Sequence, residues 1–306
     1  MNPIQFIKDI TRPIRRPFKR ARLEFLKRYC VKKYSDYLYR SQLGKKLNWT
    51  NPVDLNEKIN WLAFNTDTTE WTRLSDKYLV REFVKERGCE DILIPLLGKW
   101  NSVEEIEWST LPDDYVLKTN CGSGDTTIIR NSKQEKPSAD VLKRINSALQ
   151  NRFGLETAEP HYLRIQPCII AEQLLQTKDG SSITDYKIWC FGGKPYCFFT
   201  CSNRDIENHT VDFNYYDLGW IRHDEKMADA FKNTAVVPRP RNLEKLLIYA
   251  SILSNGFPQV RIDLYEVDDN IYFGEMTFTS LEARMRCFTQ ETLNEMGKMI
   301  ILPSKR

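Results

Sequence analysis

The chain has 306 residues, of which 41% are hydrophobic, so it can bury a substantial core divided between two or three lobes. Its apolar runs fall short of the ~20 residues that a transmembrane helix needs, and the sequence predicts no membrane span. The N-terminus lacks the apolar core of a secretory signal. Eight cysteines without a CxxC pair, and only three histidines, argue against a zinc site or a disulfide framework and indicate a reducing cytoplasm.

Basic charge is concentrated near the N-terminus. Residues 1–33 contain eleven Lys or Arg and two acidic residues, a net charge of +9, while the rest of the chain carries −5. Apolar or small residues recur there at the spacing of an amphipathic helix: Ile14, Phe18, Ala21, Phe25 and Tyr29. Such a helix can pack on the body through its apolar stripe, or residues 8–33 can lie on an anionic membrane or a lipid-linked glycan. Nucleic acid is a weaker partner because no recognised nucleic-acid motif accompanies the charge.

The following region, residues 48–100, is predicted to be mostly helical. NPVDLNEKINWLAF combines capping residues with a 3.6-residue apolar period, and TRLSDKYLVREFVKERG predicts one further helix that ends at Gly88. The short apolar passage DILIPLLGKW comes next and is interrupted by Pro95 and Gly98.

Strands and helices then interleave towards the C-terminus. Strands are expected over residues 115–118, 126–130, 168–172, 184–200 and 211–217. Helices are expected over residues 138–152 and 242–254. Because the order lacks strict βαβ alternation, it predicts an α+β fold with antiparallel sheet.

The passage QVRIDLYEVDDNIYFGEMTF contains two strand-like runs around a turn. Asp and Asn tolerate left-handed backbone, so residues 268–270 predict a three-residue hairpin loop with Val267 opposite Ile271. The same register places Asp263 directly opposite Glu275.

Two carboxylates that face each other across a ladder, with Cβ atoms about 5 Å apart, destabilise a sheet unless positive charge lies between them. A divalent cation such as magnesium would supply that charge, because it prefers carboxylate oxygens and substrate phosphates. The alternative is a solvent-facing pair of ordinary strand acids neutralised by Arg261 or a nearby lysine. Arg261 is expected opposite Thr277, where it could clamp a phosphate or carboxylate.

A small polar loop, residues 120–125, follows the strand that Lys118 closes. Because a second strand follows the loop instead of a helix, it cannot be a Walker P-loop. Gly122, Ser123 and Gly124 would still let backbone N–H groups approach a phosphate, with Lys118 supplying positive charge. A plain hairpin turn is the alternative.

Another candidate nucleotide contact is the end of the strand over 168–172. Free backbone groups at Glu172 and Gln173 could read an adenine edge, with Leu174 or Leu175 beside the ring, although an ordinary strand end has the same appearance.

Two further sets of charged residues are candidates for substrate contact. Asp185 and Lys187 alternate onto one strand face, a pattern that is also typical of a surface salt bridge. Arg204 lies with Asn208 and His209 in a polar loop that could contact an anionic substrate.

The order of these features resembles the ATP-binding elements of the ATP-grasp superfamily, and the chain is most similar to its TupA-like branch, named for teichuronopeptide synthesis. The resemblance covers roughly residues 47–279. It is carried by WTNPVDLNEKINWL, LSDKYLVREFV, IPLLGKW, YVLKTNCGSGDTTII, IIAEQLL, DYKIWCFGGKP and GFPQVRIDLYEVDDNIYFGEMTF.

The resemblance implies an ATP-grasp fold, in which two α+β lobes with antiparallel sheets grip ATP. The implied ATP-binding residues are Lys118, Gly122, Ser123, Gly124, Glu172, Gln173, Leu175, Asp185 and Lys187. The candidate catalytic residues are Lys187, which the resemblance places near the phosphates, with Arg204 and Arg261. Magnesium would be held by Asp263, Glu275 and Thr277, although most ATP-grasp ligases have Asn where this chain has Thr277.

The implied activity is carboxylate–amine ligation through an acyl phosphate, in which ATP activates the acid and an amine then attacks it. Because TupA-like proteins are associated with cell-surface polysaccharide synthesis, the resemblance implies that the acid substrate is a uronic acid or glycan and that the amine substrate is an amino acid or another amine. An ATP-dependent kinase and a non-catalytic nucleotide- or glycan-binding partner are the alternatives.

The expected organisation has four parts. A basic N-terminal segment, residues 1–46, precedes a mainly helical lobe over 47–114, a central ATP-grasp lobe over 115–175 and a C-terminal lobe over 176–306. The expected location is the cytoplasm, with peripheral contact at the inner face of the membrane.

Overall fold

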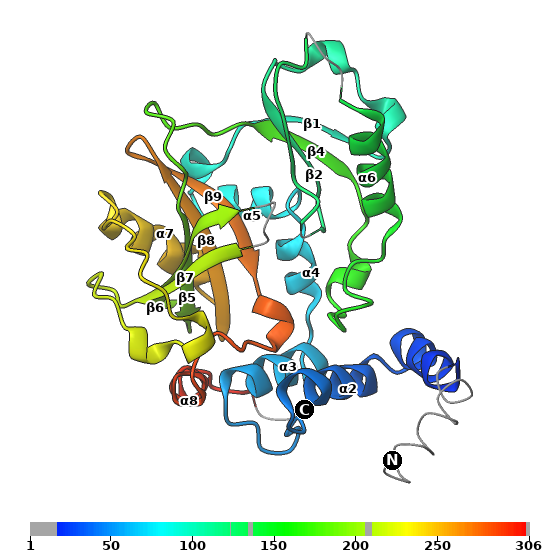
Figure 1. Ribbon diagram of the computed structural model, residues 1–306, viewed down its shortest axis with the longest axis vertical. Coiled ribbons are helices and arrows are strands. Elements are labelled where there is room, and N and C mark those ends of the chain that lie inside the picture. Colours follow the sequence, from blue (N-terminus) through cyan, green and yellow to red (C-terminus); the bar gives the residue numbers. More distant parts are fainter. Residues whose placement is uncertain (1–16, 123, 134–136, 206–209, 304–306) are drawn as a thin grey trace, which may run out of the picture.

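The computed structural model describes residues 17–122, 124–133, 137–205 and 210–303, and of residues 203–205 and 210 it describes the backbone alone. Two antiparallel sheets organise the chain and confirm the predicted α+β class (Figure 1). The smaller sheet has the order β1 (Leu96–Trp100), β4 (Ile169–Gln173), β2 (Tyr115–Thr119) and β3 (Thr127–Ile129). The larger sheet has the order β7 (Thr210–Tyr216), β6 (Lys194–Asp205), β5 (Asp185–Phe191), β8 (Gln259–Val267) and β9 (Asn270–Thr277).

Helices cover both sheets. Residues 17–29 are helical, and the helices that follow are α2 (Val31–Leu43), α3 (Leu55–Asn65), α4 (Thr69–Ser75), α5 (Val80–Glu86), α6 (Ala139–Gln150), α7 (Leu243–Ser254) and α8 (Gln290–Lys298). Within the described ranges, no helix is both long enough and apolar enough to cross a membrane.

The described residues form two hydrophobic cores. The larger core joins the five-stranded sheet to α3, α4, α5, α7 and α8, while the smaller core joins β2, β4 and α6. Figure 1 shows the smaller sheet with α6 beside it at the upper right and the larger sheet with α7 at the left. The predicted domain boundaries stay predictions. Strand β1, which belongs to the predicted helical lobe over residues 47–114, pairs with β4 in the sheet of the predicted central lobe over 115–175.

The single helix predicted to end at Gly88 is wrong, because the structure has two short helices, α4 and α5. The chain turns at Asp76, whose Oδ1 accepts hydrogen bonds from the backbone N–H groups of Tyr78 (2.8 Å) and Leu79 (3.1 Å). A short side chain that satisfies backbone donors in this way competes with continuous helix. The break presents Lys77 at the turn.

Strand β1 was not predicted, since Pro95 and Gly98 interrupt its apolar run. Its pairing with β4 skips a residue between Leu96 and Gly98, which is an irregularity of the β-bulge type. A Cβ on Gly98 would lie 2.2 Å from the Trp100 ring, so glycine is needed there for the ring to pack.

The acidic hairpin has the predicted pairing of Asp263 with Glu275, but the predicted three-residue loop and the pairing of Val267 with Ile271 are wrong. Val267 pairs with Asn270, so the loop has two residues, 268–269, both with positive φ as a type I′ turn requires. A register shift between Asp263 and Leu264 compensates for the shorter loop, and Asp263 therefore still faces Glu275. This irregularity is one that a period-2 pattern does not reveal.

The apolar stripe predicted on the basic helix does not pack on the body in the described part. Phe18, Phe25 and Tyr29 are 74%, 56% and 72% exposed. The opposite side is anchored instead, since the buried Lys27 forms ion pairs with Glu24 (3.0 Å) and Glu156 (2.5 Å). The packing interpretation of this stripe is therefore wrong.

A buried carboxyl group links two distant segments. Glu159 lies between α6 and β4, and it accepts a hydrogen bond from Thr279, which follows β9. Burial raises the pKa of Glu159 to about 7, and the hydrogen bond from Thr279 only partly offsets that effect.

We expect Glu159→Gln to remove a pH-dependent loss of stability. The carboxyl group ionises near pH 4.5 when unfolded and near pH 7 when folded, so its contribution is full below 4.5 and is lost as the pH rises through about 7. The loss is of order 3 kcal/mol, and the Gln variant lacks it because its neutral amide can still accept from Thr279. Urea unfolding across this pH range measures the difference.

Glu291→Gln, a change at an exposed site in α8, is the control for the loss of one carboxylate. A Glu159→Gln curve that runs parallel to the wild-type curve across this pH range contradicts the prediction.

Candidate functional site

Charged residues from three adjacent strands form one row on a face of the larger sheet. Lys187 on β5 pairs with Asp263 on β8, which in turn pairs with Glu275 on β9. In the neighbouring row Arg261 pairs with Thr277. The predicted pairings of Asp263 with Glu275 and of Arg261 with Thr277 are therefore confirmed.

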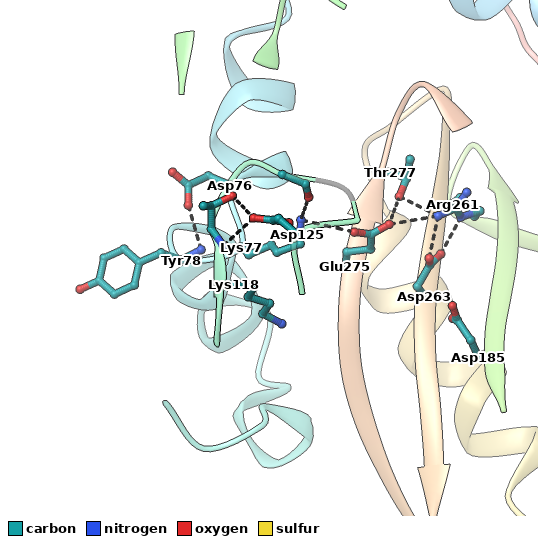
Figure 2. A network of polar contacts seen from close by, with 12 residues as sticks. Asp76, Lys77, Tyr78, Lys118, Asp125, Asp185, Arg261, Asp263, Glu275 and Thr277 are labelled. Carbon is teal, nitrogen blue, oxygen red and sulfur yellow. Dashed lines mark hydrogen bonds and ion pairs between the residues drawn. The ribbon is translucent and has the colours of Figure 1, made fainter. Parts of the chain in front are cut away.

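Arg261 lies between the two carboxylates. Its Nε and Nη2 donate to the two oxygens of Asp263, each at 2.6 Å, and Nη2 also reaches Glu275 Oε1 at 3.1 Å and Thr277 Oγ1 at 3.0 Å (Figure 2). Thr277 Oγ1 donates to Glu275 Oε1 at 2.9 Å. Burial alone would lower the pKa of Arg261, but its attraction to Asp263 outweighs burial and raises it.

Lys187 connects this row to Asp185 on its own strand. Its Nζ lies 2.5 Å from Asp263 Oδ2 and 2.5 Å from Asp185 Oδ2. Burial raises the pKa of Asp185 against the attraction of Lys187, while the two carboxylates raise the pKa of Lys187 against its burial. Asp185 Oδ1 is buried and has no hydrogen-bond partner among the described residues.

The facing carboxylates do not by themselves require a metal ion. Arg261 and Lys187 already neutralise Asp263, which is 1% exposed, so the predicted pairing by Arg261 or a nearby lysine is confirmed and magnesium at this position stays a prediction. The solvent-facing orientation of that alternative is wrong for this residue. Buried charges are tolerated only when they are paired and hydrogen-bonded, and this arrangement satisfies that condition.

Lys77 is a site residue that the pattern of the sequence did not single out, although LSDKYLVREFV contains it. Its Nζ donates to Gly122 O at 2.7 Å and lies 3.8 Å from Glu275 Oε2 (Figure 2). Burial acts to raise the pKa of Glu275, but the charges of Lys77, Arg261 and Lys187 outweigh burial and lower it to about 2. The Glu275 side chain is nevertheless 37% exposed and stays ionised.

Asn120 fixes the position of the Lys77 turn. Its side-chain Nδ2 donates to Asp76 Oδ2 at 2.7 Å, and its backbone carbonyl accepts from the backbone N–H of Lys77 at 2.8 Å. Its Oδ1 accepts from the backbone of Cys168 at 2.8 Å. One amide side chain thereby joins the helical segment, the loop after β2 and the start of β4.

The polar loop between β2 and β3 is closed from inside by Asp125, which accepts from the backbone N–H of Thr119 at 2.8 Å. A Cβ on Gly122 would lie 2.5 Å from this carboxylate, so the close approach requires glycine. Gly124 has φ +81°, which also favours glycine. Ser123 lies outside the described residues.

A second charged cluster lies on the smaller sheet. Lys118 Nζ is 2.5 Å from Glu172 Oε2, and Arg81 reaches the other oxygen of Glu172 at 3.3 Å. The three side chains are largely buried, at 8–15% exposed. Lys118 is therefore held beside the loop by an acidic partner.

The predicted adenine contacts stay predictions. The backbone N–H of Gln173 donates to Pro95 O at 3.0 Å, so this donor is used within the protein, and Leu175 is half-buried. The side chain of Arg204, with Asn208 and His209, lies outside the described residues.

The donor set fits a magnesium ion that arrives with nucleotide phosphates. Among the described residues, Glu275 Oε2 has Lys77 at 3.8 Å as its one charged neighbour, whereas the Asp263 oxygens and the Thr277 hydroxyl already have hydrogen-bond partners. In the described part of the chain, no group of three or more His, Cys, Asp or Glu side chains could hold an ion alone. Magnesium commonly combines one or two carboxylates with phosphate oxygens.

Solved structures give low-identity matches. Biotin carboxylase from Campylobacter jejuni, solved as a β,γ-ATP complex, is 16% identical with a TM-score of 0.47, and the match covers 82% of this chain and 54% of that one. D-alanine–D-alanine ligase from Helicobacter pylori is 15% identical with a TM-score of 0.42, with 82% and 64% covered. The chain thus spans less than two thirds of either protein.

No curated protein matches the sequence. A family model described as TupA-like ATP-grasp matches residues 57–301, which is most of the chain. The matched range contains both sheets, the loop after β2 and the charged row on β5, β8 and β9. The protein therefore belongs to the TupA-like ATP-grasp family.

Proposed function

We propose that this protein is an ATP-dependent carboxylate–amine ligase. The observation that carries the proposal is the set of three cations around the charged row: Lys187, Arg261 and Lys77 come from three separate segments and converge on its two facing carboxylates. Phosphoryl transfer depends on positioning and on positive charge around the transferring group, and this row supplies both.

The proposed reaction has two steps. A substrate carboxylate oxygen attacks the γ-phosphorus of ATP, and the bond between that phosphorus and the β,γ-bridging oxygen breaks. The products of this step are an acyl phosphate and ADP. An amine nitrogen then attacks the acyl carbon, the bond to phosphate breaks, and the amine loses a proton as the amide forms. Phosphate replaces the poor leaving group that a free carboxylate would present.

Each candidate residue has a role in this proposal. Lys118 and Lys187 bind phosphate oxygens, and Arg261 stabilises the charge that develops during transfer. Asp185 Oδ1, a buried acceptor without a partner in the described part, would accept a hydrogen bond from the ribose. Glu275 would hold magnesium, which neutralises phosphate charge when bound, and Asp263 would join it by giving up a contact with Lys187 or Arg261. Thr277 orients Glu275 through its hydroxyl.

The same proposal extends to the remaining nucleotide contacts. The loop with Gly122, Ser123 and Gly124 would cover the phosphates, Glu172 and Gln173 would meet the adenine, and Arg204 would face the acid substrate.

The proposed substrates are a uronic acid or glycan and an amino acid or other amine, in cell-surface polysaccharide synthesis. The proposed site of action is the cytoplasmic side of an anionic membrane, which residues 8–33 would contact; residues 8–16 lie outside the described part.

The experiment that tests the ligase is ADP release with ATP and magnesium, across a panel of uronic acids and amino acids. We expect ADP release that requires an acid and an amine together. Release with an acceptor but no amine would identify a kinase, and nucleotide binding without release under any condition would identify a non-catalytic partner.

Glu275→Gln is expected to lower ADP release at least about 100-fold, because it removes the most accessible carboxylate of the row while keeping an oxygen for Arg261 and Thr277. Glu244→Gln, an exposed change on α7, is the matched control. Equal activity in Glu275→Gln would contradict the magnesium assignment.

Lys77→Met is expected to weaken ATP binding roughly tenfold or more, since a charge-assisted contact to the Gly122 loop and the cation facing Glu275 are both lost. Fluorescence titration with a nucleotide analogue measures the change. Lys77→Arg should recover part of the affinity, and Lys85→Met on α5 is the control. Unchanged affinity in Lys77→Met would remove Lys77 from the site.

A further inference from the structure

A cavity of about 620 Å³ lies well away from the charged row, between the helix over residues 17–29, α2 and the loop that follows α2. Its lining carries five basic side chains and one acidic one. The basic ones are Lys19, Arg22, Lys33, Arg40 and Lys46.

The cavity keeps most of its positive charge. In the described ranges, none of its five cations forms an ion pair with a carboxylate. Its acidic residue, Asp36, accepts a hydrogen bond from Trp49 Nε1 at 2.7 Å. Unpaired cations that converge on a hollow favour an anionic ligand.

An exposed aromatic row borders this cavity. Phe18, Phe25 and Tyr29 recur at intervals of seven and four residues, which places them on one side of the helix. Arg22 falls on the same side, between Phe18 and Phe25, and also lines the cavity. The row and the basic cavity therefore form one continuous surface.

The helix over residues 17–29 is attached to the rest of the protein by the side that lies opposite its aromatic row. Lys27 is only 8% exposed and pairs with Glu156 of the segment that precedes β4. Figure 1 shows the helix in blue at the lower right, away from both sheets. The aromatic side chains are therefore uncovered by any described segment.

We infer that this surface binds an anionic phospholipid bilayer, with the aromatic row in the membrane interface and a headgroup phosphate in the basic cavity. Aromatic side chains suit the boundary between headgroups and acyl chains, and nearby cations add attraction to anionic lipid. An exposed aromatic row beside unpaired cations on one helix is the arrangement of a helix that lies in a membrane interface, and this favours a bilayer over a soluble glycan. The inference extends the membrane part of the proposed function, and vesicle binding does not depend on ligase chemistry.

The test is sedimentation of the full chain with vesicles of phosphatidylcholine alone, or of equal parts phosphatidylcholine and phosphatidylglycerol. We expect binding to the anionic vesicles only, weakened by added salt. Arg22→Gln with Lys33→Gln should lower the partition coefficient about 30-fold. Phe18→Ser with Phe25→Ser should lower it about tenfold or more.

Matched controls are available on the other side of the molecule. Lys194→Gln with Lys245→Gln removes two exposed cations, and Ile221→Ser with Ile248→Ser removes two exposed apolar side chains. Both should bind anionic vesicles as the wild type does. Residues 8–16 add the same charge to every variant, so the differences report on the described surface.

Three results would overturn the inference. They are absence of binding to anionic vesicles, equal binding to both vesicle types, and wild-type binding by either the basic-cavity or the aromatic-row variant. Loss in the cavity variant alone, with competition by inorganic diphosphate, would mean a soluble phosphate ligand. Failure of ADP release with intact vesicle binding would count against the ligase proposal only.

Discussion

The structure of this protein depends on neutralising buried charge across three adjacent strands. Asp263 is nearly inaccessible, and an isolated carboxylate in that position would cost far more than any single packing contact returns. Arg261 and Lys187 remove this cost by contacting both of its oxygens. Lys77, with Arg261 and Lys187, lowers the pKa of Glu275 against its burial, so the cations around the row neutralise both of its facing carboxylates.

This arrangement also determines how distant segments meet. Lys77 lies at the break between α4 and α5, and it contacts both the loop after β2 and the end of the row on β9. Asn120 connects the same break to the smaller sheet. A ligand that enters between the sheets would therefore encounter charges from both of them, as a nucleotide polyphosphate requires. The basic N-terminal surface is separate from this network, and membrane binding is the role proposed for it.

Local patterns predicted a large part of the fold. Alternating and 3.6-residue apolar periods identified most strands and helices, because they depend on neighbouring residues alone. The pairing of Asp263 with Glu275 was also predicted, although through a three-residue loop that the structure replaces with a two-residue turn and a compensating irregularity. Strand β1 and the break at Asp76 were missed, since a bulge and a side-chain hydrogen bond leave no periodic signal.

The sequence by itself determined the α+β class, the facing acids on the hairpin, the order of the candidate nucleotide-binding elements and the basic character of the N-terminal segment. Only the tertiary structure decided that Arg261 lies between those acids, that Lys77 joins them, and that the aromatic row of the first helix stays uncovered. The physical reason is the separation of the interacting residues along the sequence. Hairpin register depends on nearby residues, through side-chain alternation and turn geometry, whereas contacts between remote segments depend on how the two cores pack.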